Sequence, residues 1–258
     1  MVTFDSNVWR PAAAPVRFPN DPAFSHFVRI NQAIRDGEIG GRLSETVFTL
    51  EAITRVGRRA FFSGYKPKIS FRESVLPDGT IQVDFSIGPD TAAHPGNNPY
   101  LSTSLADALG IGFRLMRCPR VAGAQNPDLR DEWFGAPADS GEIADKFGEV
   151  ARRIESCGAG QAVVKRIGAQ YAPPNEHWSP GLANAPPAEE DHIAEAVAEW
   201  ADGDSIAAHV AYGNDVFCTR DRAVGAGAAS VLSATNRAWL ERDYGVKFAL
   251  PEEICRII

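Results

Sequence analysis

The chain has 258 residues, of which 44% are hydrophobic and 23% charged, and its formal net charge is −7. This length and apolar content suffice for one sizeable core, so we expect a single domain over residues 1–258. The negative charge excludes a global basic field that would attract nucleic acid, although a local basic patch stays compatible with it. The four cysteines form no CxxC pair, which disfavours a zinc site and a disulfide framework.

The start of the sequence and its apolar runs bear on localisation. The first residues, MVTFDSNVW, lack the basic region and the long apolar run of a secretory signal. No apolar run reaches the length that spans a membrane. We therefore expect a cytoplasmic protein without a membrane-spanning segment.

The N-terminal part predicts a short strand followed by helices. Val2–Phe4 is apolar and β-prone, and Asp5 follows it at once. An acid in this place can serve a functional site, or it can simply cap the next helix. After an irregular proline-rich loop, apolar residues at helical spacing predict helices at 24–36 and 45–59, the second of which carries Glu51.

The sequence pattern of residues 62–100 differs from that of the flanking segments, and we predict that they form an insertion. Lys68–Val75 and Thr80–Ile87 alternate apolar and polar residues on either side of a Pro-Asp-Gly turn, which predicts an antiparallel hairpin. An arm over a cleft and a contact between copies of the chain are both open interpretations of it. Residues 88–100 read as a loop.

The second half of the chain alternates strands and helices. Its predicted strands are 113–118, 216–218 and 246–250, and its predicted helices include 103–109, 140–157, 160–171 and 189–200. Long loops are expected at 119–137 and 172–188. This order argues for an α/β fold, a three-layer sandwich with a mostly parallel central sheet and an inserted β-hairpin.

The most informative stretch is DSIAAHVAYGNDVFCTRD, from Asp204 to Asp221. We expect a break at 201–203, a helix that Asp204 opens, a tight turn, and then a buried strand. Thr219 ends that strand and Asp221 lies just beyond it. Because ligands of open α/β sheets bind at the carboxyl ends of the strands, these two acids are expected to face one cleft.

Acids at such positions point to a divalent cation. Carboxylates gathered in one cleft repel each other and raise their own pKa values, so cations between them stabilise the charged forms. Oxygen ligands suit Mg²⁺ or Mn²⁺. An ion of this kind activates water and stabilises the charge on a phosphodiester under attack.

Four segments of the chain together resemble the PIN domain, a metal-dependent ribonuclease fold. They are FDSNVW at Phe4–Trp9, FTLEAITR at Phe48–Arg55, DSIAAHVAYG at Asp204–Gly213 and DVFCTRDRA at Asp215–Ala223. The resemblance covers the two ends of the chain, while the hairpin and the two long loops are additions to the family's pattern.

The resemblance implies a set of site residues. The catalytic metal ligands would be Asp5, Glu51, Asp204 and Asp221, which would bind Mg²⁺ or Mn²⁺. Thr219 would support these acids, and Asn7 would be a further polar group beside them. Arg220 and Arg222 flank Asp221, where they either meet a phosphate or form a solvated surface.

The implied function is a metal-dependent endoribonuclease that hydrolyses RNA through ion-activated water. The family includes toxins of toxin–antitoxin pairs, so an antitoxin or another protein partner, and a homo-oligomer, stay open. The alternative is a catalytically silent PIN-fold protein that binds RNA or protein. A phosphatase for small phosphate esters is disfavoured, because no second Asp stands two residues after Asp5.

Overall fold

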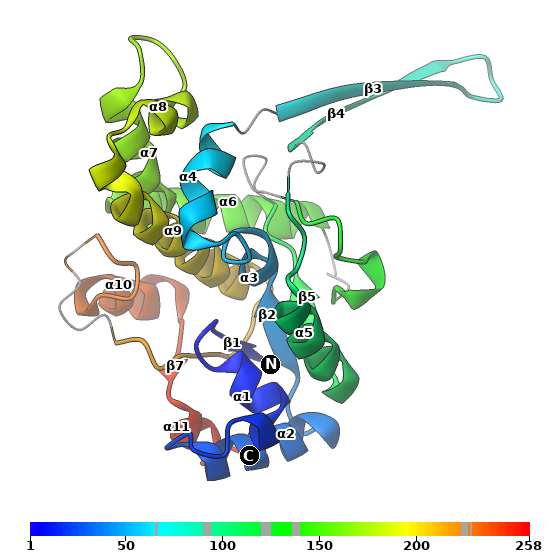
Figure 1. The fold of residues 1–258 in the computed structure, drawn as a ribbon. Coiled ribbons are helices and arrows are strands. Elements are labelled where there is room, and N and C mark those ends of the chain that lie inside the picture. Colours follow the sequence, from blue (N-terminus) through cyan, green and yellow to red (C-terminus); the bar gives the residue numbers. More distant parts are fainter. Residues whose placement is uncertain (65–66, 90–93, 120–124, 136–139, 223–226, 228) are drawn as a thin grey trace.

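A five-stranded, all-parallel sheet lies at the centre of the molecule (Figure 1). The computed structural model describes residues 1–64, 67–89, 94–119, 125–135, 140–222, 227 and 229–258, without the side chains of 67–72, 84–89 and 140. The sheet order is β5-β2-β1-β6-β7. The strands are β1 (Val2–Phe4), β2 (Gly41–Ser44), β5 (Arg114–Met116), β6 (Val216–Cys218) and β7 (Phe248–Ala249). The predicted α/β fold with a parallel sheet is confirmed.

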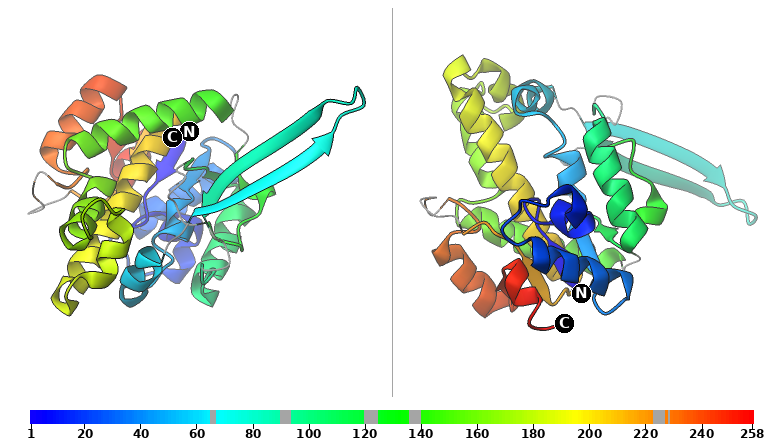
Figure 2. Two further views of the ribbon diagram at one scale, coloured as in Figure 1. Left: turned by 90° about the horizontal axis from the view of Figure 1, so that it is seen from above. Right: turned by 60° about the horizontal axis from the view of Figure 1, so that its bottom comes forward.

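Helices cover both faces of this sheet, as the two further views show (Figure 2). One apolar cluster joins the sheet to α1 (Trp9–Ala13), α2 (Phe24–Arg35), α5 (Pro99–Ile111) and α11 (Pro251–Ile254). A second cluster joins the other face to α6 (Ser140–Ser156), α9 (Glu190–Ala211) and α10 (Ala234–Tyr244). Among the described residues, no helix combines the length and the apolar character needed to cross a membrane.

Alternation along the short strands explains the two clusters. Val2 and Phe4 of β1 belong to the first cluster, whereas Phe217 of β6 belongs to the second. Successive side chains of a strand point to opposite faces, so even three-residue strands contribute to both layers. Burial on both faces fits the apolar composition of central parallel strands.

A third apolar cluster extends the molecule beyond the sheet. It joins α9 to α4 (Arg55–Ser63), α7 (Gln161–Tyr171) and α8 (Trp178–Asn184). The predicted 172–188 loop therefore contains a helix, α8, which buries Leu182 completely. The short α1 likewise replaces part of the irregular loop expected after residue 10.

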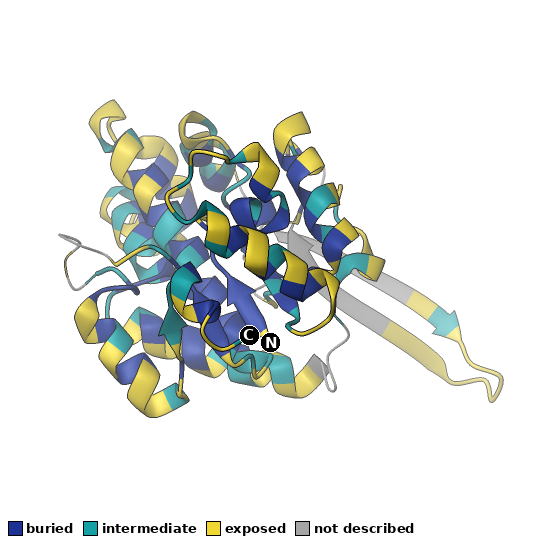
Figure 3. Cartoon of the chain, turned by 90° about the horizontal axis from the view of Figure 1, so that it is seen from below, coloured by how far each residue is buried: buried dark blue, intermediate teal, exposed yellow. Residues whose placement is uncertain are grey.

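The inserted hairpin is present and projects from the body (Figure 1). Its strands are β3 (Pro67–Val75) and β4 (Ile81–Pro89), which pair antiparallel. The predicted turn holds Gly79 at a φ of +84°, a conformation that favours glycine. The tip of the hairpin is exposed in Figure 3, with Val75 74% and Ile81 64% accessible. Residues 90–93 of the loop expected at 88–100 lie outside the described residues.

The expected helix break at 201–203 is wrong, because α9 runs without interruption from Glu190 to Ala211. Gly203 does not end the helix but allows a close contact. A Cβ added at Gly203 would lie 3.0 Å from the Cα of Gly160, the residue that precedes α7. The glycine is thus required by packing between elements, which its position in the sequence does not reveal.

The helix expected at 45–59 is also wrong, since it is divided into α3 (Thr46–Thr49) and α4. Thr54 has an extended backbone, with φ −58° and ψ 148°, as the residue before a new helix commonly has. Glu51 therefore lies in the connection between two helices and not within one. The strand β2 that precedes α3 is not among the predicted strands. Residues 120–124 and 136–139 of the other predicted loop, and 223–226 and 228, lie outside the described residues.

We expect the Gly181→Ala substitution to destabilise the protein by about 1–3 kcal/mol. The added methyl would overlap the carbonyl oxygen of Gly168, where α8 packs on α7. Gly110→Ala in α5 is the matched control, because a Cβ there meets nothing within 4 Å. The control should be neutral or stabilising by up to about 1 kcal/mol. Urea unfolding of both variants measures this, and equal midpoints would contradict the close packing.

Candidate acidic site at the carboxyl edge of the sheet

Asp5 stands at the carboxyl end of β1, held by three donors. The backbone N–H of Ser6 donates to Oδ1 at 2.7 Å, and the Asn7 amide donates to Oδ2 at 2.8 Å. The Thr219 hydroxyl donates to the same Oδ2 at 2.6 Å. Burial raises the pKa of Asp5, the charge of Asp221 raises it further, and these hydrogen bonds oppose the rise.

Strand pairing explains why residues so distant in sequence meet here. Phe4 of β1 is in register with Cys218 of β6, and the Asp5 N–H donates to the Cys218 carbonyl at 3.0 Å. Thr219 therefore leaves the sheet beside Asp5. Its hydroxyl also accepts the backbone N–H of Asp221 at 3.0 Å, which fixes the position of that residue.

Glu51 approaches the same edge from the connection between α3 and α4. Burial raises the pKa of Glu51 to about 7, with a smaller contribution from the charge of Asp5. The guanidinium of Arg58 and a hydrogen bond with Ser6 oppose this rise. Because the helix predicted at 45–59 is interrupted between α3 and α4, Glu51 lies close enough to Asp5 for their charges to interact.

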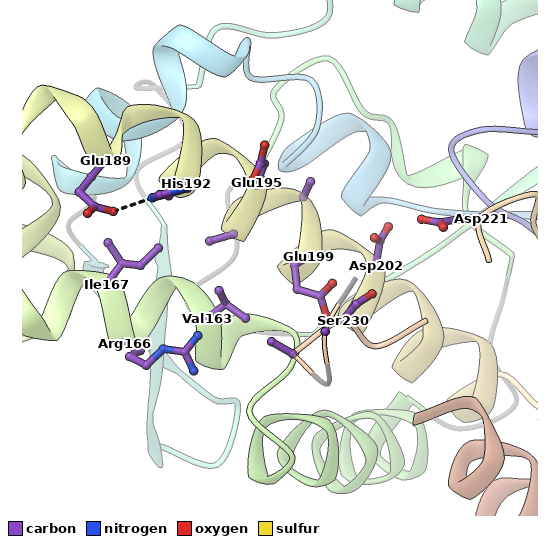
Figure 4. A pocket seen from close by; sticks show the side chains of 14 residues that line it. Val163, Arg166, Ile167, Glu189, His192, Glu195, Glu199, Asp202, Asp221 and Ser230 are labelled. Atoms are coloured by element: carbon purple, nitrogen blue, oxygen red, sulfur yellow. Dashed lines mark hydrogen bonds and ion pairs between the residues drawn. The ribbon is translucent and has the colours of Figure 1, made fainter. Parts of the chain in front are cut away.

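Asp202 of α9 completes the group. Burial raises its pKa well above the usual range, and the charges of Asp5, Glu51, Glu199 and Asp221 add to that effect. Figure 4 shows Asp202 on α9 between Glu199 and Asp221. We call Asp5, Glu51, Asp202 and Asp221 the acidic cluster.

Asp204, the residue expected in this role, makes different contacts. It is 2% exposed, and its Oδ2 accepts the indole N–H of Trp200 at 2.9 Å. Its charge raises the pKa of Glu45, a partly buried acid after β2 whose pKa is about 7 mainly because of desolvation. Helix positions two apart differ by about 200° around the axis, so Asp202 and Asp204 project from opposite sides of α9.

Glu199 is a further acid that the sequence analysis missed. Its Oε1 accepts the backbone N–H of Gly160 at 3.0 Å and that of Val231 at 2.7 Å. Burial raises its pKa to about 7. Glu195, Glu199 and Asp202 recur at helical spacing, a signal that appears once 189–211 is read as a single helix.

Two arginines near the acids were also missed. Arg58 is 7% exposed, and its guanidinium donates to the carbonyls of Ile53 at 3.1 Å and Ala194 at 2.5 Å. Its charge interacts with Glu51 and Asp202, although burial lowers its own pKa. Arg237 of α10 donates to the backbone carbonyl of Asp221. These cations offset part of the acidic charge inside the protein.

The two arginines predicted beside Asp221 have separate environments. The Arg220 guanidinium forms an ion pair with Asp21 and lies over the ring of Phe27, at 4.7 Å from its centroid. Its backbone N–H donates to Asn7 Oδ1 at 3.0 Å, which ties Asn7 to the end of β6. Arg222 is exposed, and its charge contributes to lowering the pKa of Arg237.

A groove of about 580 Å³ opens from the acidic cluster along α7 and α9 (Figure 4). Asp202 and Asp221 lie at one end of the groove. The other residues that line it are Val163, Arg166, Ile167, Glu189, His192, Glu195, Ala196, Ala198, Glu199, Gly227, Ala229 and Ser230. The acids are therefore accessible from one side.

The described part of the chain holds no group of three or more His, Cys, Asp or Glu side chains arranged to bind a metal ion. What the acidic cluster shows is electrostatic coupling, since the charges of Asp5, Glu51 and Asp221 all contribute to raising the pKa of Asp202. The charge of Asp221 also raises the pKa of Asp5, and that of Asp5 raises the pKa of Glu51. Such coupling is characteristic of functional sites, although structural ion networks produce it as well.

Comparisons of the chain with protein-family models, with curated proteins and with solved structures found no match. The fold and the site together define an α/β protein with an all-parallel sheet and a cluster of coupled acids at the carboxyl edge of that sheet.

Proposed function

We propose that the protein is a PIN-like, Mg²⁺- or Mn²⁺-dependent endoribonuclease whose metal ligands come from the acidic cluster. The observation that carries this proposal is the coupling of Asp202 to Asp5, Glu51 and Asp221, which come from three other elements. The proposed ligands differ from the predicted set in one residue, since Asp202 takes the place of Asp204.

The donor chemistry of the cluster fits a hard divalent cation. Its members offer carboxylate oxygens, which Mg²⁺ and Mn²⁺ prefer. Burial and the charges of neighbouring acids disfavour the charged forms of Asp5, Glu51 and Asp202, so a cation among them would relieve both costs. When bound, such an ion would activate water and offset the charge that develops on a phosphodiester.

The surrounding residues orient the acids. The Thr219 hydroxyl donates to Asp5 and accepts the backbone N–H of Asp221, so one hydroxyl fixes the positions of two members of the cluster. Asn7 donates to Asp5, and its own amide oxygen is fixed by the backbone of Arg220. Arg58 holds positive charge beside Glu51. An antitoxin partner and a homo-oligomer stay predictions.

Cleavage of single-stranded RNA tests the proposal. We expect activity with Mn²⁺ or Mg²⁺, none with EDTA, and a loss of roughly 10²–10³-fold in kcat/KM for both Asp5→Asn and Asp221→Asn. Cleavage should be followed on end-labelled RNA, with circular dichroism to establish that each variant is folded. Activity in EDTA, or variants as active as the wild type, would refute metal-dependent cleavage by the acidic cluster. No cleavage by the wild type in either metal would leave a silent PIN-like binding protein.

A further inference from the structure

The groove beside the acidic cluster runs along two helices, α7 and α9. Gly160 precedes α7 and packs against Gly203 of α9, next to Asp202. From that contact α7 rises about 1.5 Å per residue, so Arg166 lies about 9 Å along the helix axis from Gly160. Figure 4 shows the Arg166 side chain at the groove, on α7, away from Asp202 and Asp221.

The acids in the groove outside the cluster each have a polar partner. Oε2 of Glu189 lies 3.1 Å from Nδ1 of His192, which carries a positive charge only when it is protonated, and Glu195 lies 3.4 Å from Arg55. Glu199 accepts two backbone N–H groups and has a pKa of about 7, raised mainly by burial. These acids therefore oppose an incoming anion less than their number suggests.

Arg166 is the cation that remains available to a ligand. Its side chain is exposed, and none of the described residues forms an ion pair with it. The walls beside it, Val163, Ile167 and Ala196, are apolar. A flexible anionic chain with apolar surfaces between its charges, such as a single nucleic-acid strand, matches this pattern.

We propose that the groove binds the RNA strand on one side of the cleaved bond, with Arg166 contacting a backbone phosphate outside that bond. The inference rests on the proposed nuclease function. It adds to that function a residue whose contribution to substrate binding begins only when the RNA is long enough to reach Arg166.

The experiment compares wild type, Arg166→Gln and the control Arg35→Gln on oligoribonucleotides from two to eight nucleotides in Mn²⁺. Arg35 is an exposed arginine on α2, outside the groove, so its variant loses the same charge elsewhere. For the octanucleotide we expect Arg166→Gln to raise KM about tenfold with kcat within twofold, because a phosphate contact mainly affects binding. The slope of log(kcat/KM) against log[salt] should fall by about 0.7. The dinucleotide should be cleaved equally by all three proteins.

Binding of a fluorescent octanucleotide in EDTA gives a second readout that does not need catalysis. There, too, Arg166→Gln should bind about tenfold more weakly than Arg35→Gln. Should Arg166→Gln match Arg35→Gln in both assays while the wild type cleaves RNA, the groove assignment is wrong and the nuclease proposal stands. Should the wild type neither cleave nor bind any oligonucleotide, both fail together.

Discussion

Asp202→Asn is expected to lose roughly 10²–10³-fold in metal-dependent cleavage of RNA, whereas Asp204→Asn keeps activity within a few-fold of the wild type. The two substitutions are isosteric, lie on one helix and remove the same charge. Asp202 is coupled to the other three acids of the cluster, while Asp204 accepts a hydrogen bond from Trp200. Only the first removes a carboxylate from the proposed metal site.

Stability separates this effect from misfolding. Asp202→Asn removes a carboxylate whose charged form is disfavoured by burial and by the neighbouring acids, so its melting temperature should equal or exceed that of the wild type. Asp204→Asn retains an oxygen that accepts the Trp200 indole N–H, so it should also fold. Cleavage rates and thermal melts of both variants are the measurements. The reverse order of activities would restore Asp204 as the ligand.

The second large effect concerns the pH dependence of stability through Glu51. Its pKa is about 7 in the folded protein, compared with about 4.3 in an unfolded chain. Between these values the folded state binds a proton that the unfolded state has released. The stability that Glu51 contributes is therefore complete below about pH 4 and is lost as the pH rises through about 7.

Glu51→Gln removes this loss. Between about pH 4 and pH 8, we expect the free energy of unfolding of the variant to rise relative to that of the wild type by on the order of 2–3 kcal/mol. That gain corresponds to roughly 5–10 °C in melting temperature. Comparing the two proteins cancels other titrating groups, such as His209, whose pKa burial lowers to about 4. Melting curves in EDTA across this range measure the effect, and a difference that does not grow with pH would contradict it.

Added Mn²⁺ extends this comparison to the metal. A ligand that binds only the folded state raises its stability by RT ln(1 + [L]/Kd), where [L] is the free ligand concentration. At about pH 8, above the pKa of about 7 of Glu51, Mn²⁺ should raise the melting temperature of the wild type and have less effect on Glu51→Gln. Equal shifts in the two proteins would place the ion elsewhere.

The sequence predicted the elements whose patterns are local. The apolar strands at Val2–Phe4 and Val216–Cys218, and the hairpin around its Pro-Asp-Gly turn, are found where they were expected. Acids after two parallel strands indicated the edge at which Asp5 and Asp221 lie. These patterns depend on residue type and on the periods of strands and turns, which hold without knowledge of the rest of the chain.

The sequence patterns failed where packing overrides local signals. A glycine beside Asp202 indicated a break, yet it lies inside α9 because a neighbouring backbone passes close to it. The resemblance to the PIN domain placed the site acid at Asp204, whereas Asp202, on the opposite side of the helix, is the residue whose pKa the charges of Asp5, Glu51 and Asp221 help to raise. The buried arginine at position 58 was not predicted either, since its partners are backbone carbonyls from other segments.

What the sequence by itself determined is the class of fold and the two strand ends that carry acids, because alternation and turn chemistry are properties of neighbouring residues. Only the tertiary structure decided which further acids lie near them. The continuous α9 presents Asp202 and Glu199 toward that edge, and the gap between α3 and α4 places Glu51 there. Burial and mutual charge, which raise the pKa values of these groups, arise only when the chain is folded.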